Sequence, residues 1–205
     1  MKNISKISEL AELIDENKDA RVIGIVGAPG SGKSTITASL SESLKRENMV
    51  IPMDGFHYSQ SKLREMGRRD RMGAPDTFDA QELTQKLGAV VKRESDVSFP
   101  DFDRTIEERI VPDSIVVPKS IDLVLLEGNY LLYQEDGWQD LASLLDLSIY
   151  VEIAEATRLK RLLDRHVKFG KTPEFAKEWM EKVDNPNAKK ILSSKPLADI
   201  VFDYN

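Results

Sequence analysis

The sequence predicts an α/β fold in which helices cover a mainly parallel sheet of five strands. Short apolar runs of strand length, which alternate with segments of helical periodicity, lie at 21–27, 49–53, 121–128, 147–152 and 198–202. Strands that alternate with helices in this way form a parallel sheet. The length of 205 residues fits a single domain over 1–205.

The first half of the chain carries the first two predicted strands. Apolar side chains recur at helical spacing over 4–14, so we expect the chain to open with an amphipathic helix. The first strand breaks into glycines and is followed by a predicted helix at 33–47. After the strand at 49–53 we expect a long polar loop at 59–80 and a helix at 80–93.

The second half begins with short β-prone pieces within 97–118. Prolines divide these pieces, which predicts edge strands, a small β excursion beside a functional loop. The run IDLVLLEG at 121–128 is the clearest buried strand of the chain. Helices are predicted at 154–169 and 173–183, and together they would form a helical lid over about 158–185.

Composition narrows the possible functions. Acidic residues outnumber basic ones by 35 to 29, a net charge of −6, which argues against a surface for nucleic acid or an anionic membrane. The chain has no cysteine and two histidines, which excludes a thiolate nucleophile and argues against a multi-histidine metal site. No stretch approaches the ~20 apolar residues of a membrane span, and the N-terminus lacks an apolar signal core. We therefore expect a cytoplasmic protein.

Residues 27–34, Gly-Ala-Pro-Gly-Ser-Gly-Lys-Ser, match the phosphate-binding motif G-x-x-x-x-G-K-[ST] in full, between a predicted strand and a predicted helix. Glycines let backbone N–H groups turn toward a phosphate, and the helix adds the positive end of its dipole. Lys33 would reach the β- and γ-phosphates, and the Ser34 hydroxyl would bind Mg²⁺. The residues predicted to bind ATP here are Gly27, Ala28, Pro29, Gly30, Ser31, Gly32, Lys33, Ser34 and Thr35.

Other nucleotide-binding classes fit less well. A dinucleotide-binding fold needs G-x-G-x-x-G, and Pro29 stands where the second glycine would be. A GTPase needs N-K-x-D, which residues 17–20 miss, and no LSGGQ-like signature of ABC-type ATPases is present. These exclusions leave a kinase or an unusual ATPase.

Two carboxylates follow apolar strands, Asp54 in VIPMDGFH and Glu127 in LVLLEGNY. The carboxyl ends of parallel strands converge on one edge of a sheet, so both acids are expected to point toward the phosphate site. One would hold Mg²⁺, directly or through water, and the other would accept a proton from an attacking hydroxyl. The alternative is that each acid only caps a turn.

The segments GAPGSGKST, MDGFHYS, RMGAPDTFD, FPDFDR and LLEGNYLL, with a late arginine-rich helix, resemble in order the motifs of the uridine kinase, phosphoribulokinase and bacterial pantothenate kinase superfamily. The likeness is greatest to its nucleoside/nucleotide-kinase-like branch, labelled fructose transport system kinase-like. The resemblance implies a P-loop NTPase three-layer fold that uses ATP and Mg²⁺. It also implies that Asp54 is the catalytic base and that Glu127 organises metal or water. The uridine-kinase segment DSFY reads DGFH here, and the pantothenate-kinase continuation DGFLYPN is missing, so neither substrate follows.

Candidate residues for binding the phosphoryl acceptor follow the second strand and flank the β-prone pieces. Basic residues dominate 62–71, which favours a pocket for an anionic acceptor such as a carboxylate or a sugar phosphate. For most of this cluster the alternative is a solvated loop. Arg71 stands out because it abuts the segment GAPDTFD, which resembles the family's acceptor region. The other candidates are His57, Asp79, Asp101, Asp103 and Arg104.

Basic side chains share one narrow face of the predicted helix at 154–169, namely Arg158, Arg161, Arg165 and Lys168. Such a stripe is typical of a lid helix that brings arginine onto the γ-phosphate, and Arg161 and Arg165 are favoured as catalytic residues. The alternative is an exposed face with surface salt bridges.

Two further positions complete the predicted site and its surroundings. We expect His166 on the helix surface and not as a ligand. The resemblance implies that a turn at 184–187 lies near the nucleotide base, with Asn187 as an adenine neighbour.

Together these patterns predict an ATP- and Mg²⁺-dependent kinase that moves the γ-phosphoryl group to a hydroxyl of a small metabolite. The acceptor would be a sugar, a nucleoside, or a pantothenate-like or glycerate-like molecule. The alternative is a nucleotide-binding regulatory ATPase without a small-molecule acceptor. The oligomeric state stays open.

Overall fold

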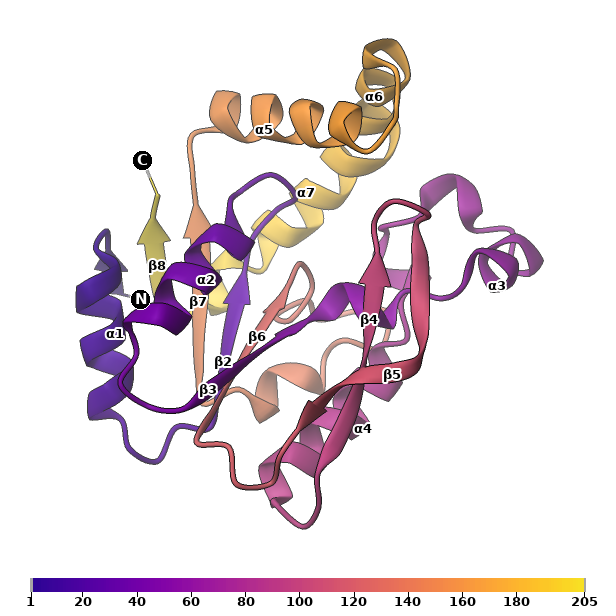
Figure 1. The fold of residues 1–205 in the computed structure, drawn as a ribbon. Helices are drawn as coiled ribbons and strands as arrows, with labels where there is room; N and C mark the ends of the chain where they lie inside the picture. Colours follow the sequence, from indigo (N-terminus) through magenta and orange to yellow (C-terminus); the bar gives the residue numbers. More distant parts are fainter. Residues whose placement is uncertain (1, 205) are drawn as a thin grey trace.

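The computed structural model describes residues 2–204 and is built on a sheet of six strands in the order β1-β8-β7-β2-β6-β3 (Figure 1). All neighbouring strands of this sheet are parallel. The strands are β1 (Lys2–Ile4), β2 (Val22–Val26), β3 (Asn48–Pro52), β6 (Leu123–Gly128), β7 (Leu147–Glu152) and β8 (Ile200–Asp203). The predicted α/β fold with a parallel sheet is confirmed.

The sheet has one strand more than the five predicted. Residues at the start of the expected opening helix pair instead as β1 with β8, and helix α1 (Ile7–Glu16) begins only at Ile7. Ile4 is buried in the same core as the apolar side chains of α1. Because Ile4 also fits the helical spacing, periodicity could not separate the strand from the helix. The partner strand lies at the other end of the chain.

Helices cover both faces of the sheet because strand side chains alternate between two cores. Ile23 and Ile25 of β2 belong to a core shared with α1 and α2 (Lys33–Ser43). Val22 and Val26 belong to the other core, which includes apolar side chains of α4 (Ala80–Lys92). Strands of a sheet that is buried on both faces are apolar along their whole length. This continuous apolar pattern allowed the central strands to be predicted from the sequence.

The segment 59–80, predicted as a loop, contains short helical turns. Ser59 caps α3 (Gln60–Glu65) by accepting a hydrogen bond from the Lys62 N–H at 3.2 Å. Single 3₁₀ turns occupy Met53–Phe56, Arg69–Arg71, Pro75–Thr77, Leu141–Leu144 and Lys195–Leu197.

Strands β4 (Val97–Asp103) and β5 (Glu108–Val117) form a separate antiparallel hairpin, which confirms the predicted small β excursion. The pairing register shifts beside Pro100, which lacks the N–H that a regular ladder needs. Arg109 of β5 donates to both carboxylate oxygens of Glu82 on α4, at 2.6 and 2.8 Å. The hairpin is therefore anchored to α4 and stands beside the sheet (Figure 1).

A run of helical segments follows β7, namely α5 (Glu155–Lys168), α6 (Pro173–Trp179), a π-helical turn (Met180–Asp184) and α7 (Asn185–Ser193). In Figure 1, α5 crosses above the ends of the sheet strands, and we call residues 155–184 the lid segment. The turn predicted at 184–187 is wrong, because the π-helical turn runs directly into α7. Pro186 is compatible with this helix because it lies in the first turn, where its missing N–H is not needed.

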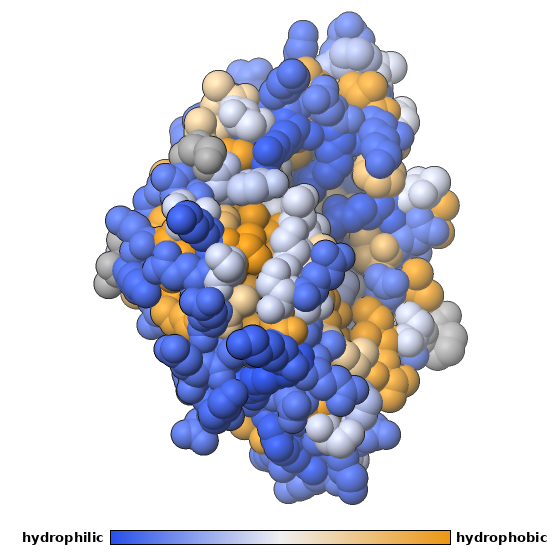
Figure 2. Space-filling model, turned by 60° about the vertical axis from the view of Figure 1, so that its left-hand side comes forward, coloured by the Kyte–Doolittle hydropathy of each residue, from blue (hydrophilic) through white to orange (hydrophobic). Residues whose placement is uncertain are grey.

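Hydrophilic side chains cover most of the face shown in Figure 2, and hydrophobic atoms show there as separate patches. Among the described residues, none of the helices combines the length and the apolar character that crossing a bilayer requires.

Candidate functional site

A cleft of about 570 Å³ lies where the carboxyl ends of β2, β3 and β6 meet. Its walls come from the phosphate loop, the turn after β3, the end of β6, the hairpin and the lid segment. The predicted site residues that line it are Pro29, Gly30, Gly32, Lys33, Ser34, Thr35, Asp54, His57, Asp101, Arg104, Glu127, Arg161 and Arg165.

The phosphate loop follows β2 and is held in shape from the lid side. Gly30 has a φ of 85°, which glycine adopts without strain. A Cβ at this position would lie 2.6 Å from the carbonyl oxygen of Arg158, so α5 packs directly against the loop. The buried Arg158 guanidinium donates to the carbonyl oxygen of Pro29 at 3.1 Å. Arg158 therefore braces the loop, whereas the sequence placed it on the basic stripe.

The loop presents donors that a phosphate can use. Helix α2 begins at Lys33 directly after Gly32, which has no side chain to cap the free N–H groups of the first turn. The Ser31 hydroxyl is buried, and it has no hydrogen-bond partner within the described part of the chain. An orphaned buried hydroxyl beside an uncapped helix start fits an anionic group that accepts hydrogen bonds. The residues present therefore fit the phosphates of ATP.

Lys33 lies in the buried floor of the same cleft. Its Nζ donates to the carbonyl oxygen of Ala28 at 3.3 Å, across the phosphate loop. Burial lowers the pKa of the Lys33 ammonium group to about 8, although the nearby Glu127 carboxylate acts in the opposite direction. A bound phosphate would supply negative charge at this position and raise that pKa again.

ATP binding near pH 8 is therefore expected to be accompanied by proton uptake at Lys33. Because the pKa in the free protein is about 8, roughly half a proton should be taken up at that pH. The affinity for ATP should fall as the pH rises above that value. Calorimetry in two buffers of different ionisation enthalpy measures the uptake, and Lys33→Met should remove the contribution. Equal uptake by that variant would contradict the assignment.

Ser34 and Glu127 form an oxygen-rich corner beside Lys33. The Ser34 hydroxyl donates to Glu127 Oε1 at 2.8 Å, and Glu127 of β6 is level with Pro52, the last residue of β3. Within residues 2–204 no group of three His, Cys, Asp or Glu side chains could enclose a metal. Mg²⁺ is commonly held by one or two carboxylates together with substrate phosphates and water. Ser34 and Glu127 fit Mg²⁺ held in that manner.

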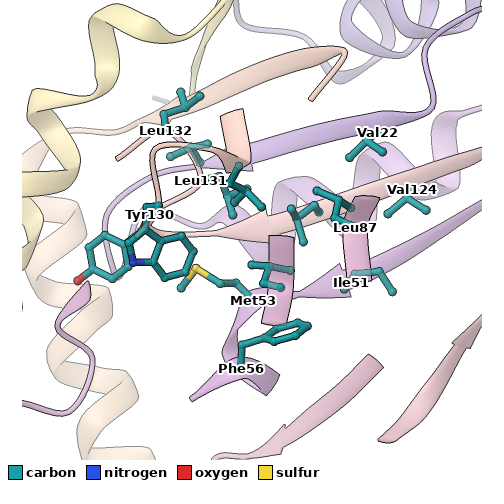
Figure 3. Packing of buried hydrophobic residues seen from close by; sticks show 14 of the residues in the cluster. Val22, Ile51, Met53, Phe56, Leu87, Val124, Tyr130, Leu131 and Leu132 are labelled. Atoms are coloured by element: carbon teal, nitrogen blue, oxygen red, sulfur yellow. The ribbon is translucent and has the colours of Figure 1, made fainter. Parts of the chain in front are cut away.

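Asp54 lies in the 3₁₀ turn directly after β3. Its neighbours Met53 and Phe56 are fully buried in a core with Tyr130, and Figure 3 shows these side chains within the packed layer. Gly55 lets the β4 strand pack closely against this turn, because a Cβ at position 55 would collide with the carbonyl oxygen of Pro100. The packing therefore leaves the Asp54 carboxylate at the cleft while its neighbours point into the core.

The Asp54 carboxylate pairs with the Arg104 guanidinium, which comes from the hairpin turn at 104–107. Burial by itself would raise the pKa of the Asp54 carboxyl, but the charge of Arg104, with smaller contributions from other cations, lowers it. Asp54 is therefore ionised at neutral pH and carries the charge that a proton acceptor needs.

His57 lines the cleft and belongs to a cluster of aromatic rings. Its ring lies 3.8 Å from that of Phe78 and 4.7 Å from that of Phe102, measured between centroids. Burial lowers the pKa of His57, so the ring is neutral at neutral pH. Nδ1 carries the proton, since it lies 2.8 Å from the Asp54 carbonyl oxygen, which can only accept.

The structure separates the two arginines that the sequence proposed for catalysis. Arg165 lies in the electrostatic field of Asp54 and Asp184, which are paired with Arg104 and His166. Arg161 is exposed instead, with its guanidinium 4.9 Å from the centroid of the Tyr204 ring. Both arginines line the cleft, with Arg165 near Asp54 and Lys33. The Arg161 guanidinium lies beside the phosphate loop, 3.0 Å from where a Cβ of Gly32 would be.

Two predicted acceptor residues have structural partners and lie outside the cleft lining. Asp79 caps α4 by accepting a hydrogen bond from the Glu82 N–H at 2.8 Å. Asp103 accepts from the Thr105 N–H at 2.7 Å within the hairpin turn. Both carboxylates therefore accept hydrogen bonds from nearby backbone N–H groups, as short acidic side chains often do in turns.

Most ion pairs of the basic cluster at 62–71 are local, and Arg69 is the exception because it pairs with Glu107 of the hairpin turn. Arg71 pairs with Asp76 at 2.7 Å and lies outside the cleft lining. Asn187 is buried within α7 and likewise does not line the cleft. The structure therefore does not bring either residue to the predicted site.

The structure adds cleft residues that the sequence analysis missed. His166, expected on the helix surface, is half-buried, and its Nε2 lies 2.7 Å from Asp184 Oδ2 in the π-helical turn. Glu107 of the hairpin and Lys171 of the lid segment line the cleft and pair at 2.7 Å. π-Helical turns are often found at functional sites. The pairs His166–Asp184 and Glu107–Lys171 could not be predicted, because the spacing of their residues in the sequence matches no known motif.

Comparisons with known proteins point to one group. The model of the phosphoribulokinase / uridine kinase family matches residues 22–204. The "Uncharacterized protein YggC" of Escherichia coli strain K12 is 34% identical over 201 residues, 95% of this chain and 82% of the relative. The pantothenate kinase of Latilactobacillus sakei is 32% identical over 169 residues, 80% of this chain and 54% of the relative. The crystal structure of a "putative fructose transport system kinase" from Silicibacter sp. TM1040 superposes with a TM-score of 0.86 at 32% identity, covering 97% of this chain and 100% of that one.

Proposed function

We propose that this chain, which belongs to the phosphoribulokinase / uridine kinase family, transfers a phosphoryl group to a hydroxyl of a small metabolite. The metabolite would bind in the cleft next to the Asp54 carboxylate. As a member of that family it is an ATP-dependent small-molecule kinase that uses Mg²⁺. In the proposed reaction the acceptor oxygen forms a bond to the γ-phosphorus, and the bond from that phosphorus to the bridging oxygen of ADP breaks. The hydroxyl proton passes to Asp54.

The roles of the other residues follow from their places in the cleft. Lys33 and the loop N–H groups would hold the phosphates, and Arg165 would neutralise charge on the transferring group. Ser34 and Glu127 would hold Mg²⁺, which supplies further neutralisation when bound. The protein therefore contributes position and charge, which is what phosphoryl transfer demands.

One observation carries the proposal. A proton acceptor, a phosphate loop and an oxygen-rich metal corner, contributed by the carboxyl ends of three different strands, line one continuous cleft.

The acceptor half of the cleft narrows the substrate to a small polar molecule. The Phe102 ring, which packs against the buried His57, would contact an uncharged ring or chain of the acceptor, and Arg104 would bind an acidic or hydroxyl group. Sugars, nucleosides, and pantothenate-like or glycerate-like acids all combine such features, and the mixed wall accommodates each class.

A screen of acceptors tests the proposed function. Release of ADP is measured with ATP and Mg²⁺ alone and after addition of nucleosides, pantothenate, glycerate, sugars or sugar phosphates. We expect one class to raise ADP release by at least about 10²-fold over the rate with water. If no class does so while ATP binding alters association with a protein partner, the protein is a nucleotide-dependent regulator and the proposal fails.

Arg165→Ala is expected to lower kcat by about 10²-fold, because the lost guanidinium is half-buried near Asp54. Arg161→Ala should lower it by less than about tenfold, since Arg161 is exposed to solvent, which screens its charge. Lys160→Ala on the exposed side of the same helix serves as the control. Steady-state kinetics with the acceptor found in the screen measure all three. Equal effects of the Arg161 and Arg165 variants would contradict the separation described above.

A further inference from the structure

We propose that Glu107 is a positioning residue that fastens the lid segment and the hairpin turn together over the cleft. The effect on turnover rests on the proposed function, but the fastening itself does not. Glu107 with its two cationic partners, Arg69 and Lys171, is called the Glu107 bridge below.

The bridge joins three segments that are far apart in the sequence. Glu107 Oε1 accepts from Lys171 Nζ at 2.7 Å, in the connection between α5 and α6. Glu107 Oε2 accepts from Arg69 Nη2 at 2.7 Å, in the turn after α3. Each carboxylate oxygen therefore holds a different segment. Charge-assisted bonds of this kind are short and directional.

The backbone of Glu107 is also held in place. Its φ is 51°, in the left-handed region that a non-glycine residue rarely occupies. Its carbonyl oxygen accepts from Gln60 Nε2 at 2.7 Å, and Gln60 in turn accepts a hydrogen bond from Arg69. Several hydrogen bonds thus hold Glu107 in this strained backbone conformation. Such strained and firmly held residues occur at clamps and switch regions.

The hairpin turn links the bridge to the proposed proton acceptor. Arg104 and Glu107 are the two ends of a four-residue turn between β4 and β5. Arg104 pairs with Asp54 inside the cleft, and Glu107 is held from outside by the lid segment. The base of the hairpin is anchored to α4 through Arg109. Loss of the Glu107 carboxylate therefore removes the ion pairs that hold the turn of Arg104 to the lid segment and to Arg69, while the base of the hairpin stays in place.

The bridge also stands between two hollows of the surface. Glu107 and Lys171 line the main cleft and a second cavity of about 310 Å³, which Ile106 and Phe175 also line. Both ion pairs are half-buried, with Glu107 34% and Lys171 17% exposed, so thermal motion can open them. An open bridge would join the two hollows and give an acceptor a path to Asp54. A closed bridge would keep water from the reacting group.

Glu107→Gln tests the fastening without any ligand. We expect backbone hydrogen exchange to become faster by at least about fivefold at 104–107 and 168–172, because both ends of the bridge are released. Acrylamide should also quench Trp179 more strongly, since Lys171 lies 5.7 Å from its ring centroid. Trp138 is fully buried and contributes little to the change.

Two further variants complete the test of the fastening. Glu178→Gln is the matched control, because it removes an exposed ion pair of 2.6 Å to Lys182 on the same lid segment. Lys171→Met should reproduce the faster exchange at 168–172, although Arg69 still holds Glu107, and the double variant should exchange no faster there than Glu107→Gln. If Glu107→Gln and Lys171→Met exchange no faster than the Glu178→Gln control, the bridge is only a surface contact and the proposal is overturned.

A second readout separates positioning from general stability. With ATP and Mg²⁺ but no acceptor, ADP release to water should rise by about threefold to tenfold in Glu107→Gln. The midpoint of thermal unfolding should stay that of the Glu178→Gln control. A lower midpoint with slower ADP release would mean a merely structural role and would overturn the proposal. If no variant releases ADP in a Lys33-dependent way, the proposed function fails, whereas the exchange measurement still decides the fastening.

Discussion

Lys33→Ala is expected to lower the rate of phosphoryl transfer by about 10³-fold, the effect of removing a preorganised charge from a buried catalytic site. Lys33 is buried beside the phosphate loop, and its ammonium group donates a hydrogen bond across that loop to the carbonyl oxygen of Ala28. A cation in that position would act on the β- and γ-phosphates, whose charge changes most during transfer. Initial rates of ADP formation at saturating ATP and acceptor measure the loss.

The fold should survive this substitution. Lys33 occupies the first turn of α2, where alanine has at least equal helix propensity, and its side chain fills no apolar core. Circular dichroism and the thermal midpoint check that point. Lys45→Ala is the matched control, because Lys45 is an exposed lysine just beyond the end of the same helix. Wild-type turnover in a folded Lys33→Ala variant would refute the assignment of the phosphate loop.

Asp54→Asn is expected to depress kcat by roughly 10²–10⁴-fold, the usual contribution of a positioned general base. The amide keeps the size of the side chain and an oxygen that can still accept from Arg104, but it cannot take the hydroxyl proton. ATP binding should persist because Asp54 lies at the acceptor side of the phosphate loop. Pre-steady-state rates and the dissociation constant for ATP, measured separately, distinguish the two effects.

Glu127→Gln provides the contrast to this result. It should raise the Mg²⁺ concentration needed for half-maximal rate, because a carboxylate beside Ser34 is lost from the metal corner. Titration of Mg²⁺ against both variants decides the roles. If Asp54→Asn shows the metal defect and Glu127→Gln the rate defect, the two roles are reversed. If both mainly lower the thermal midpoint, the acids only cap turns.

Much of the site was accessible from the sequence because its parts depend on local patterns. The phosphate loop is a contiguous motif, and its glycines and lysine have the same roles in any strand–loop–helix context. Asp54 and Glu127 were found because both follow buried parallel strands, whose carboxyl ends must meet. The register confirms this reasoning, since Glu127 is level with the residue that ends β3.

The acceptor side could not be predicted as well, because polar side chains there have two possible uses. Asp79 and Asp103 satisfy nearby N–H groups, and Arg71 satisfies a nearby carboxylate. Arg104 has a similar sequence neighbourhood but reaches Asp54, fifty residues away. Only the path of the hairpin decides between a local partner and a distant one.

What the sequence determined by itself is the set of features that repeat or follow one another along the chain: the parallel sheet, the phosphate loop and the two acids. What only the tertiary structure decided is the set of pairings across the chain. Strand β1 finds its edge at β8, Arg158 braces Pro29, and Glu107 joins Arg69 to Lys171. The physical reason is that periodicity reports which side of an element is buried, whereas a charge or a strand edge accepts any complementary partner that the fold brings within reach.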